Sequence, residues 1–175
     1  MTVAQIVLMG VAGSGKTTVA GLLADRLGCV RAEADDFHPA ANVAKMASGI
    51  PLDDDDRRPW LAAIGVWIGQ QERAGRTAVV TCSALKRAYR DVLRAASPHV
   101  VFVHLTGTPE LLAARMAGRK GHFMPPALLD SQLATLEPLA PDELGIALDV
   151  RQPPEVVAEQ AAAFAALPGR GGVGP

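Results

Sequence analysis

Aromatic residues and long apolar runs are both scarce in this sequence. Phe, Trp and Tyr together make up only 4% of the 175 residues, so we expect a core of aliphatic side chains, with small residues where helices meet a sheet. No apolar run is long enough to span a bilayer, which argues against a membrane protein. The net charge is also low, at −1, so charge gives no reason to expect binding to nucleic acid or to an anionic membrane.

Cysteine is equally rare. The two cysteines, Cys29 and Cys82, lie in or beside apolar stretches that are typical of strands. Thiols in such places are usually buried and free, so we expect no disulfide and a reducing compartment. The sequence also enters a strand-like stretch at once and shows no secretory signal pattern, which favours a cytoplasmic protein.

What the sequence does contain is a phosphate-binding loop near its start. The residues from Gly10 to Thr17 match the pattern of glycine, four residues, glycine, lysine and then serine or threonine. A buried-strand pattern precedes the loop, and a helical pattern that stops at Gly28 follows it. Glycines let backbone N–H groups approach a polyphosphate, and the helix N-terminus adds positive charge. The strand, loop and helix order argues against the alternative of a plain glycine-rich turn.

The motif predicts a nucleoside triphosphate bound together with Mg²⁺. Lys16 is placed to reach the outer phosphates, and the Thr17 hydroxyl is placed to ligate the metal. The residues expected to contact the nucleotide are Gly10, Val11, Ala12, Gly13, Ser14, Gly15, Lys16, Thr17 and Thr18, with Arg115, Arg119, Gln152 and Pro153 from later segments. Gln152 and Pro153 follow the last predicted strand, where they would border the adenine.

Strand-like stretches alternate with helical patterns along the chain. The strands are expected at residues 6–9, 29–32, 78–82, 100–105 and 146–150. This alternation predicts a three-layer α/β/α fold with a five-stranded parallel sheet and right-handed crossovers. We expect residues 1–167 to form one P-loop domain, and the glycine-rich residues 168–175 to form a disordered tail. In such sheets, ligands bind at the carboxyl ends of the strands.

The second predicted strand ends in acidic residues followed by a histidine. Glu33, Asp35 and Asp36 come first, and His38 follows before a proline. A carboxylate at this place can hold a Mg²⁺-bound water and accept the proton of an attacking hydroxyl. We favour Asp35 for both tasks, and His38 as a donor that orients the acceptor. The alternatives are an N-cap role for either aspartate and an ordinary loop position for His38.

A run of charged residues comes next. The four aspartates at residues 53–56 precede Arg57, ahead of a helix that the apolar spacing predicts over residues 60–73. Such a run is most often a solvated surface, and the aspartates can also cap the helix and favour its dipole. Arg57 or Arg58 can clamp a carboxylate with two hydrogen bonds, and we favour Arg57 for the acceptor.

The third predicted strand ends without the acidic residue that motor ATPases place there to hold Mg²⁺. Ser83 follows it, and then Lys86 and Arg90, which are four residues apart on one helical face. These groups suit a small acidic or polyol acceptor pressed against the strand end. A helix with ordinary surface cations is the alternative.

A basic segment rich in glycine and proline follows the fourth strand and its helix. Arg115 and Arg119 share a helical face there, ahead of His122. We expect residues 115–126 to form a small helical lid that brings both arginines over the transferring phosphate and excludes water. The alternative is a helix end whose cations offset its dipole.

Together, these motifs resemble the bacterial gluconokinases. The resemblance spans nearly the whole chain and rests on the phosphate loop and on residues 35–39, 45–60, 82–90 and 119–123. It implies a fold like that of nucleoside monophosphate kinases, ATP with Mg²⁺, and transfer of the γ-phosphate to the 6-hydroxyl of D-gluconate. It also implies a cytoplasmic homodimer. Ala34 stands where the family often has glycine.

The acceptor that this resemblance implies is a carboxylate on a polyol, which needs cations at one end and hydrogen-bonding groups along its length. The residues expected to bind it are Asp35, His38, Arg57, Ser83, Lys86, Arg90 and His122. Lys16, Asp35 and Arg119 are the expected catalytic residues. Thr17, together with Asp35 through a water, is expected to hold Mg²⁺.

Two other functions stay open at this point. A kinase for another small acidic acceptor, such as shikimate or a nucleotide, would need the same cations at the strand end. A nucleotide-dependent switch or binding protein would share the phosphate loop. However, the Asn-Lys-x-Asp motif with which GTP switches read guanine does not occur in the sequence.

Overall fold

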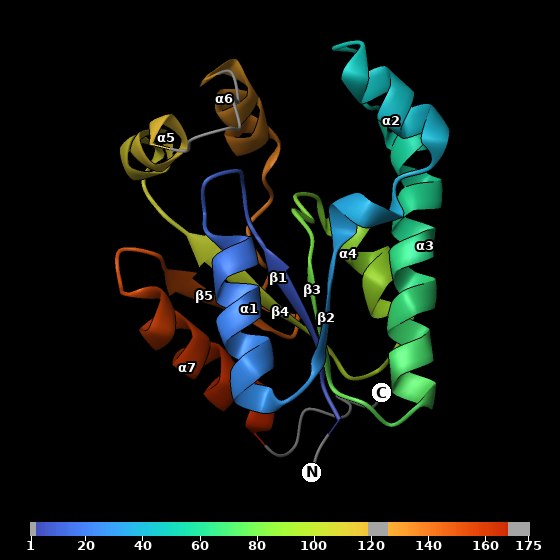
Figure 1. The fold of residues 1–175 in the computed structure, drawn as a ribbon, viewed down its shortest axis with the longest axis vertical. Helices are drawn as coiled ribbons and strands as arrows, with labels where there is room; N and C mark the ends of the chain where they lie inside the picture. Colours follow the sequence, from blue (N-terminus) through green and yellow to red (C-terminus); the bar gives the residue numbers. More distant parts are fainter. Residues whose placement is uncertain (1–2, 119–125, 168–175) are drawn as a thin grey trace.

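The computed structural model describes residues 3–118 and 126–167. Its centre is a five-stranded parallel sheet with the strand order β2-β3-β1-β4-β5 (Figure 1). The strands are β1 (Gln5–Met9), β2 (Val30–Glu33), β3 (Ala78–Thr81), β4 (Val100–Thr106) and β5 (Gly145–Asp149). The predicted parallel sheet is confirmed. Because β1 is central, the segments that follow β3 and β4 flank the phosphate loop.

Helices cover both faces of the sheet, which confirms the three-layer prediction. They are α1 (Lys16–Leu27), α2 (Ala40–Ala47), α3 (Asp54–Arg73), α4 (Arg87–Arg94), α5 (Pro109–Ala117), α6 (Pro126–Thr135) and α7 (Pro154–Ala166), with a 3₁₀ turn η1 at Ala34–Phe37. Helices α1 and α7 lie on one face and α3 and α4 on the other, while α2 and the pair α5 and α6 rise beyond the carboxyl ends of the strands (Figure 1). None of the described helices combines the length and apolar character needed to cross a membrane.

The core is largely aliphatic, as the composition predicts. One apolar cluster joins the sheet to α1 and α7, and a second joins it to α3 and α4 and includes the buried Trp60. A smaller third cluster ties the phosphate loop to α5 and α6. Its buried members are Val11, Leu85, Leu112, Met116 and Leu129. The packing therefore links the loop to both helices that follow β4.

The start of α3 differs most from the predicted boundaries. The apolar spacing predicts a start at residue 60, but the helix begins at Asp54. The Asp53 carboxylate accepts the Asp56 N–H at 2.8 Å, and the Asp56 carboxylate accepts the Asp53 N–H at 3.1 Å. This reciprocal capping box stabilises the helix start, and acidic residues in the first turn favour the dipole. Much of the charge run is therefore a helix N-terminus.

Both cysteines are free, as predicted. Cys82 is buried at the end of β3, and burial raises the pKa of its thiol to about 12, which keeps it protonated. Cys29 is only half-buried. The prediction of a buried thiol is therefore confirmed for Cys82 and only partly for Cys29.

Acid is expected to destabilise the fold through His104 on β4. Its side chain is buried, and burial, followed by the charge of Arg90, lowers its pKa to about 4. The unfolded chain binds a proton near pH 6.5 and the folded chain does so only near pH 4, so stability is present above pH 6.5 and is lost as the pH falls between these values. The loss from this one group is about 3 kcal/mol.

Urea unfolding of the wild type and of His104→Gln, measured from pH 7.5 down to pH 4.5, tests this expectation. The glutamine side chain does not titrate in this range. The unfolding free energy of the wild type should therefore fall relative to that of His104→Gln as the pH falls. A difference that stays constant with pH would contradict the expected role of His104.

Candidate active site

The phosphate loop joins β1 to α1 and is shaped by three glycines. Gly10, Gly13 and Gly15 have φ values of 147°, 78° and 90°, which residues with a Cβ rarely adopt. A Cβ on Gly10 would lie 2.8 Å from the Leu105 carbonyl oxygen, and one on Gly13 would lie 2.9 Å from that of Leu112. Glycine is therefore needed at all three places, as the motif requires.

The first turn of α1 opens directly onto this loop. Gly15 is the N-cap residue and has no side chain to satisfy the first N–H groups of the helix. These groups and the helix dipole favour an anion at this place. Lys16 Nζ lies over the loop and donates to the carbonyl oxygens of Gly10 at 2.9 Å and of Val11 at 3.1 Å. The structure therefore places the Lys16 charge at the anion site.

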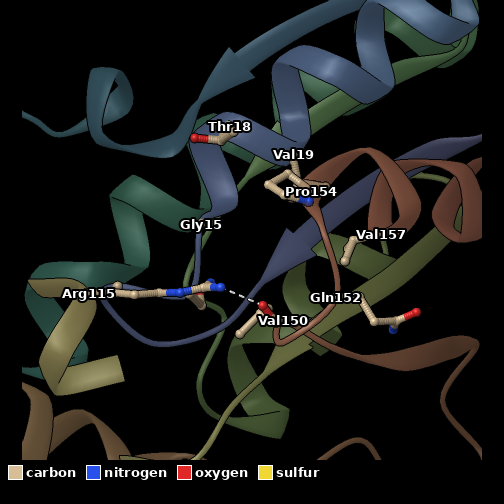
Figure 2. Close-up of a pocket in the computed structure, with 10 residues that line it drawn as sticks. Gly15, Thr18, Val19, Arg115, Val150, Gln152, Pro154 and Val157 are labelled. Carbon is tan, nitrogen blue, oxygen red and sulfur yellow. Dashed lines mark hydrogen bonds between the residues drawn. The ribbon is translucent and has the colours of Figure 1, made fainter. Parts of the chain in front are cut away.

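A pocket opens beside the loop, between α1, α5 and the segment after β5 (Figure 2). Arg115 reaches across it from α5 and donates to the Val150 carbonyl oxygen at 2.5 Å. The lining residues are Gly13, Ser14, Gly15, Thr18, Val19, Arg115, Val150, Gln152, Pro154 and Val157. Gln152 and Pro154 thus belong to the lining of the pocket and Pro153 does not, and the expected contact of Pro153 with the nucleotide stays a prediction. A partly apolar pocket next to a phosphate loop fits the nucleoside end of a nucleotide.

Glu33, the last residue of β2, is one of the carboxylates that the sequence predicts at this strand end, although no role is predicted for it alone. Its Oε2 accepts the Thr81 hydroxyl from β3 at 2.5 Å and the Thr17 hydroxyl from α1 at 3.3 Å. Mg²⁺ prefers oxygen ligands and usually takes only one or two from protein, with the rest from phosphate and water. Because three oxygen-bearing side chains meet at the first turn of α1, the residues present fit a Mg²⁺ ion at Thr17. What the sequence does not predict is the contact of Glu33 with Thr81, because that contact depends on the pairing of β2 with β3.

His38 packs flat against Trp60, with the two rings 4.5 Å apart and inclined by 9°. Buried Asn42 determines its tautomer. Asn42 Nδ2 donates to the Asp56 carbonyl oxygen at 2.8 Å, and its second N–H points at His38 Nδ1 at 3.3 Å, so Nδ1 accepts and Nε2 carries the proton. Burial is the main cause that lowers the pKa of His38. At neutral pH, His38 is therefore an uncharged ring with one N–H donor.

Arg57 on α3 and Lys86 ahead of α4 meet at one aromatic ring. Their charged groups lie 5.6 and 5.5 Å from the centre of the Tyr89 ring. Arg57 donates to the Tyr89 hydroxyl at 3.0 Å, and Lys86 pairs with Asp54 at 3.1 Å. The Tyr89 hydroxyl in turn donates to Asp54, and this bond is the main cause that lowers the Asp54 pKa. The structure thus brings together two of the cations expected to bind the acceptor.

Electrostatic interactions join these parts at the carboxyl edge of the sheet. The charges of Lys16, Asp35 and Arg57 all act on the Cys82 thiol at the end of β3, although burial dominates its raised pKa. Asp35 and Arg57 also act on His38, where Asp35 raises the pKa and Arg57 lowers it. Lys16 of the phosphate loop, Asp35 after β2 and Arg57 near the start of α3 therefore all lie near the end of β3.

Asp35 and Asp36 both lie exposed on η1. The N-cap positions of η1 and α2 are Glu33 and Pro39, so the interpretation of the two aspartates as helix caps is wrong. The Asp35 carboxylate lies instead where its charge reaches both His38 and the end of β3.

Ser83 lies in the segment between β3 and α4 (residues 82–86), which we call the acceptor loop because Ser83 and Lys86 are expected to bind the acceptor. Its carbonyl oxygen accepts the Gly10 N–H of the phosphate loop at 3.3 Å. Ala84 follows with a φ of 46°, a strained conformation for a residue with a Cβ. Such strain persists only where surrounding groups hold the backbone in place.

The expected role of Arg90 as an acceptor ligand needs correction. Arg90 is buried in the core, where it holds the strained backbone at Ala84 in place. Its side chain is 1% exposed, and it donates two hydrogen bonds to the Glu143 carboxylate, at 2.6 and 2.9 Å. Its other donors go to the carbonyl oxygens of Ala84, Leu85 and Pro138. These bonds use every N–H of the guanidinium. Arg90 therefore braces the acceptor loop and does not face an acceptor.

Some predictions fall on residues that the structure does not describe. Arg119 and His122 lie outside the described residues, as do much of the expected lid and the tail at 168–175. Arg115 is the cation of that basic segment that is described, near the end of α5. The lid and the roles of Arg119 and His122 therefore stay predictions.

Comparison with known proteins shows that the chain is similar to other proteins over most of its length, not only in the phosphate loop. The model of the family described as AAA domain matches residues 6–139. A gluconokinase of Gluconobacter oxydans (strain 621H) is 52% identical over 155 residues, which cover 89% of this chain and 87% of that protein. The thermosensitive gluconokinase of Escherichia coli (strain K12) is 44% identical over 157 residues, which cover 89% and 84%.

A solved structure gives the same result in three dimensions. The crystal structure of a gluconokinase from Sinorhizobium meliloti 1021 superposes with a TM-score of 0.85 at 46% sequence identity. The match covers 94% of this chain and 93% of that chain. The likeness therefore includes the sheet, the helices on both faces and the segments that build the site.

Proposed function

The chain belongs to the gluconokinase family, and from this membership we propose that it transfers the γ-phosphate of ATP to the 6-hydroxyl of D-gluconate. The products are ADP and 6-phospho-D-gluconate, a step of sugar-acid catabolism. The observation that carries the proposal is the hydrogen bond from Gly10 of the phosphate loop to Ser83 after β3, at the end of the sheet where the charges of Lys16, Asp35 and Arg57 also act on Cys82. The proposed phosphate-binding cation Lys16, the proposed base Asp35 and the proposed acceptor-binding cation Arg57 thereby share one edge of the sheet.

In the proposed reaction, the phosphate loop holds the triphosphate while Asp35 activates the hydroxyl. Lys16 and the loop N–H groups stabilise the charge that spreads over the transferred group. Asp35 takes the proton of the 6-hydroxyl as that oxygen attacks phosphorus in line, and the bond to the bridging oxygen of ADP breaks. Arg115, and Arg119 from the predicted lid, would add positive charge at the transferring phosphate.

Mg²⁺ is proposed to bind at Thr17, with Asp35 holding one of its waters. When bound, the ion offsets the charge of the β- and γ-phosphates. The Thr17 hydroxyl donates its proton to Glu33, which leaves its oxygen lone pairs for the metal. Glu33 thus orients Thr17, and oxygen ligands of this kind are what Mg²⁺ prefers.

Gluconate is proposed to bind to His38, Arg57, Ser83 and Lys86, and to His122 from the predicted lid. The Nε2–H of His38 can donate to a hydroxyl of the polyol, while Arg57 and Lys86 supply charge for the carboxylate. Because Lys86 is paired with Asp54 in the structure, the gluconate carboxylate would compete with Asp54 for this cation.

The direct test incubates the protein with ATP, Mg²⁺ and gluconate and measures 6-phosphogluconate. Lys16→Ala is the control, with a rate expected to be lower by about a thousandfold, because a cation that stabilises the transferring phosphate is lost. A wild-type rate no higher than that of Lys16→Ala would refute the proposal. A second assay compares gluconate with shikimate and a nucleoside monophosphate by kcat/KM. If either compound proves the better acceptor, it replaces gluconate as the proposed substrate.

We also propose a cytoplasmic homodimer, which rests on the family resemblance alone. Size-exclusion chromatography with light scattering should then give about twice the 18.2 kDa mass of the chain. A mass equal to that of a single chain at micromolar concentration would refute the dimer.

A further inference from the structure

Gln132, on α6, makes a hydrogen bond that the proposed mechanism does not use. Its Oε1 accepts the backbone N–H of Ala12, in the phosphate loop, at 2.6 Å, although the two residues are 120 positions apart. A backbone N–H can only donate, so the amide oxygen of Gln132 must face Ala12. A side chain from a distant helix therefore holds the phosphate loop between Gly10 and Gly13.

The chain that follows α6 is fixed to the acceptor loop as well. The Glu137 N–H donates to the Leu85 carbonyl oxygen at 2.7 Å, and the Glu137 carboxylate accepts the Arg87 N–H at 2.7 Å. Buried Leu129 packs α6 into one apolar cluster with Val11 and Leu85, which come from the two loops. Helix α6, together with the residues that follow it, therefore bridges the phosphate loop and the acceptor loop.

We propose that Gln132 is a positioning residue that aligns the phosphate loop with the acceptor loop. This inference rests on the proposed function, in which the first loop binds the phosphoryl donor and the second binds the acceptor. In-line transfer depends steeply on the distance and angle between the two reacting groups. Losing the Gln132 bond to Ala12 therefore lowers the rate of transfer and leaves the binding of each substrate almost unchanged.

Gln132→Met tests the proposal, because methionine keeps the length of the side chain and a good helix propensity but cannot replace the bond. We expect kcat to fall about tenfold, the effect of one lost hydrogen bond. The Kd values for a nonhydrolysable ATP analogue and for gluconate, measured by calorimetry, should stay within about twofold. Gln132→Asn, which keeps the amide but is one methylene too short, should behave in the same way.

Ser131→Ala is the matched control, because Ser131 is exposed on the same helix, and it should retain wild-type kinetics. The melting temperature of Ser131→Ala should match that of the wild type, and those of the two Gln132 variants should fall by only a few degrees, about the effect of one lost hydrogen bond. A kcat of Gln132→Met within about twofold of wild type, or Kd values that weaken as much as kcat falls, would overturn the proposal.

Amide hydrogen exchange gives a readout that needs no turnover. The Ala12 N–H, followed by NMR in the free protein, should exchange faster in Gln132→Met than in the wild type, because its acceptor is gone. Equal exchange in the two proteins would also overturn the proposal. Because exchange needs no substrate, Gln132 is tested even if gluconate fails as acceptor, and the kinetic comparison is then made with the acceptor that the panel selects.

Discussion

Replacing Asp35 by asparagine is expected to lower kcat by about a thousandfold, while the Kd of a nonhydrolysable ATP analogue stays within about twofold. Asparagine has nearly the shape of aspartate, but its amide cannot take the proton of the attacking hydroxyl. The loss therefore falls on the chemical step. The groups proposed to hold the nucleotide belong to the phosphate loop and α1, which the substitution leaves unchanged. Steady-state kinetics and calorimetry separate the two effects.

Asp36→Asn is the matched control, because it makes the same chemical change at the next exposed residue of η1. The charge of Asp35 reaches His38 and the end of β3, which places it among the proposed acceptor-binding groups. We expect Asp36→Asn to keep kcat within about twofold of wild type, as for most surface substitutions. Equal losses in the two variants, or full turnover in Asp35→Asn, would remove Asp35 as the base.

The parts of the site that are contiguous in sequence could be predicted from the sequence. The phosphate loop requires glycines at Gly10, Gly13 and Gly15 for local steric reasons, so the motif alone predicts its shape. Alternating strands and helices predict that all strand ends share one edge, and Ser83 does contact Gly10 at that edge. Periodicity is weaker at helix starts, which is why the polar first turns of α3 were missed.

Contacts that depend on strand order could not be predicted in this way. Glu33 meets Thr81 because β2 pairs with β3 in a register that places these residues opposite each other. The helical spacing between Lys86 and Arg90 suggests a shared face, but the burial of Arg90 depends on Glu143, 53 residues later. No local pattern connects Arg90 with Glu143. The spacing between Lys86 and Arg90 fits a solvated arginine as well as one in a buried ion pair.

Replacing Arg90 by methionine is expected to lower the free energy of unfolding by about 3–5 kcal/mol. The change removes the hydrogen-bonded cation of the Glu143 carboxylate, whose side chain is 2% exposed, and leaves only Arg87 at 3.9 Å. Burial alone would raise the pKa of Glu143, and hydrogen bonds, first those from Arg90, hold it below its usual value. The variant must therefore bury a poorly paired charge or protonate the carboxylate. Urea unfolding at pH 7 measures the loss.

The double replacement of Arg90 by methionine and Glu143 by leucine separates the charge effect from packing. It should recover most of the lost stability, because two apolar side chains fill the same space with no unpaired charge. A ligand for the acceptor would behave in the opposite way, since its loss would raise the KM for gluconate and leave unfolding almost unchanged. If Arg90→Met unfolds at the wild-type urea concentration and binds gluconate about tenfold more weakly, Arg90 contacts the acceptor and the ion pair with Glu143 is not its main role.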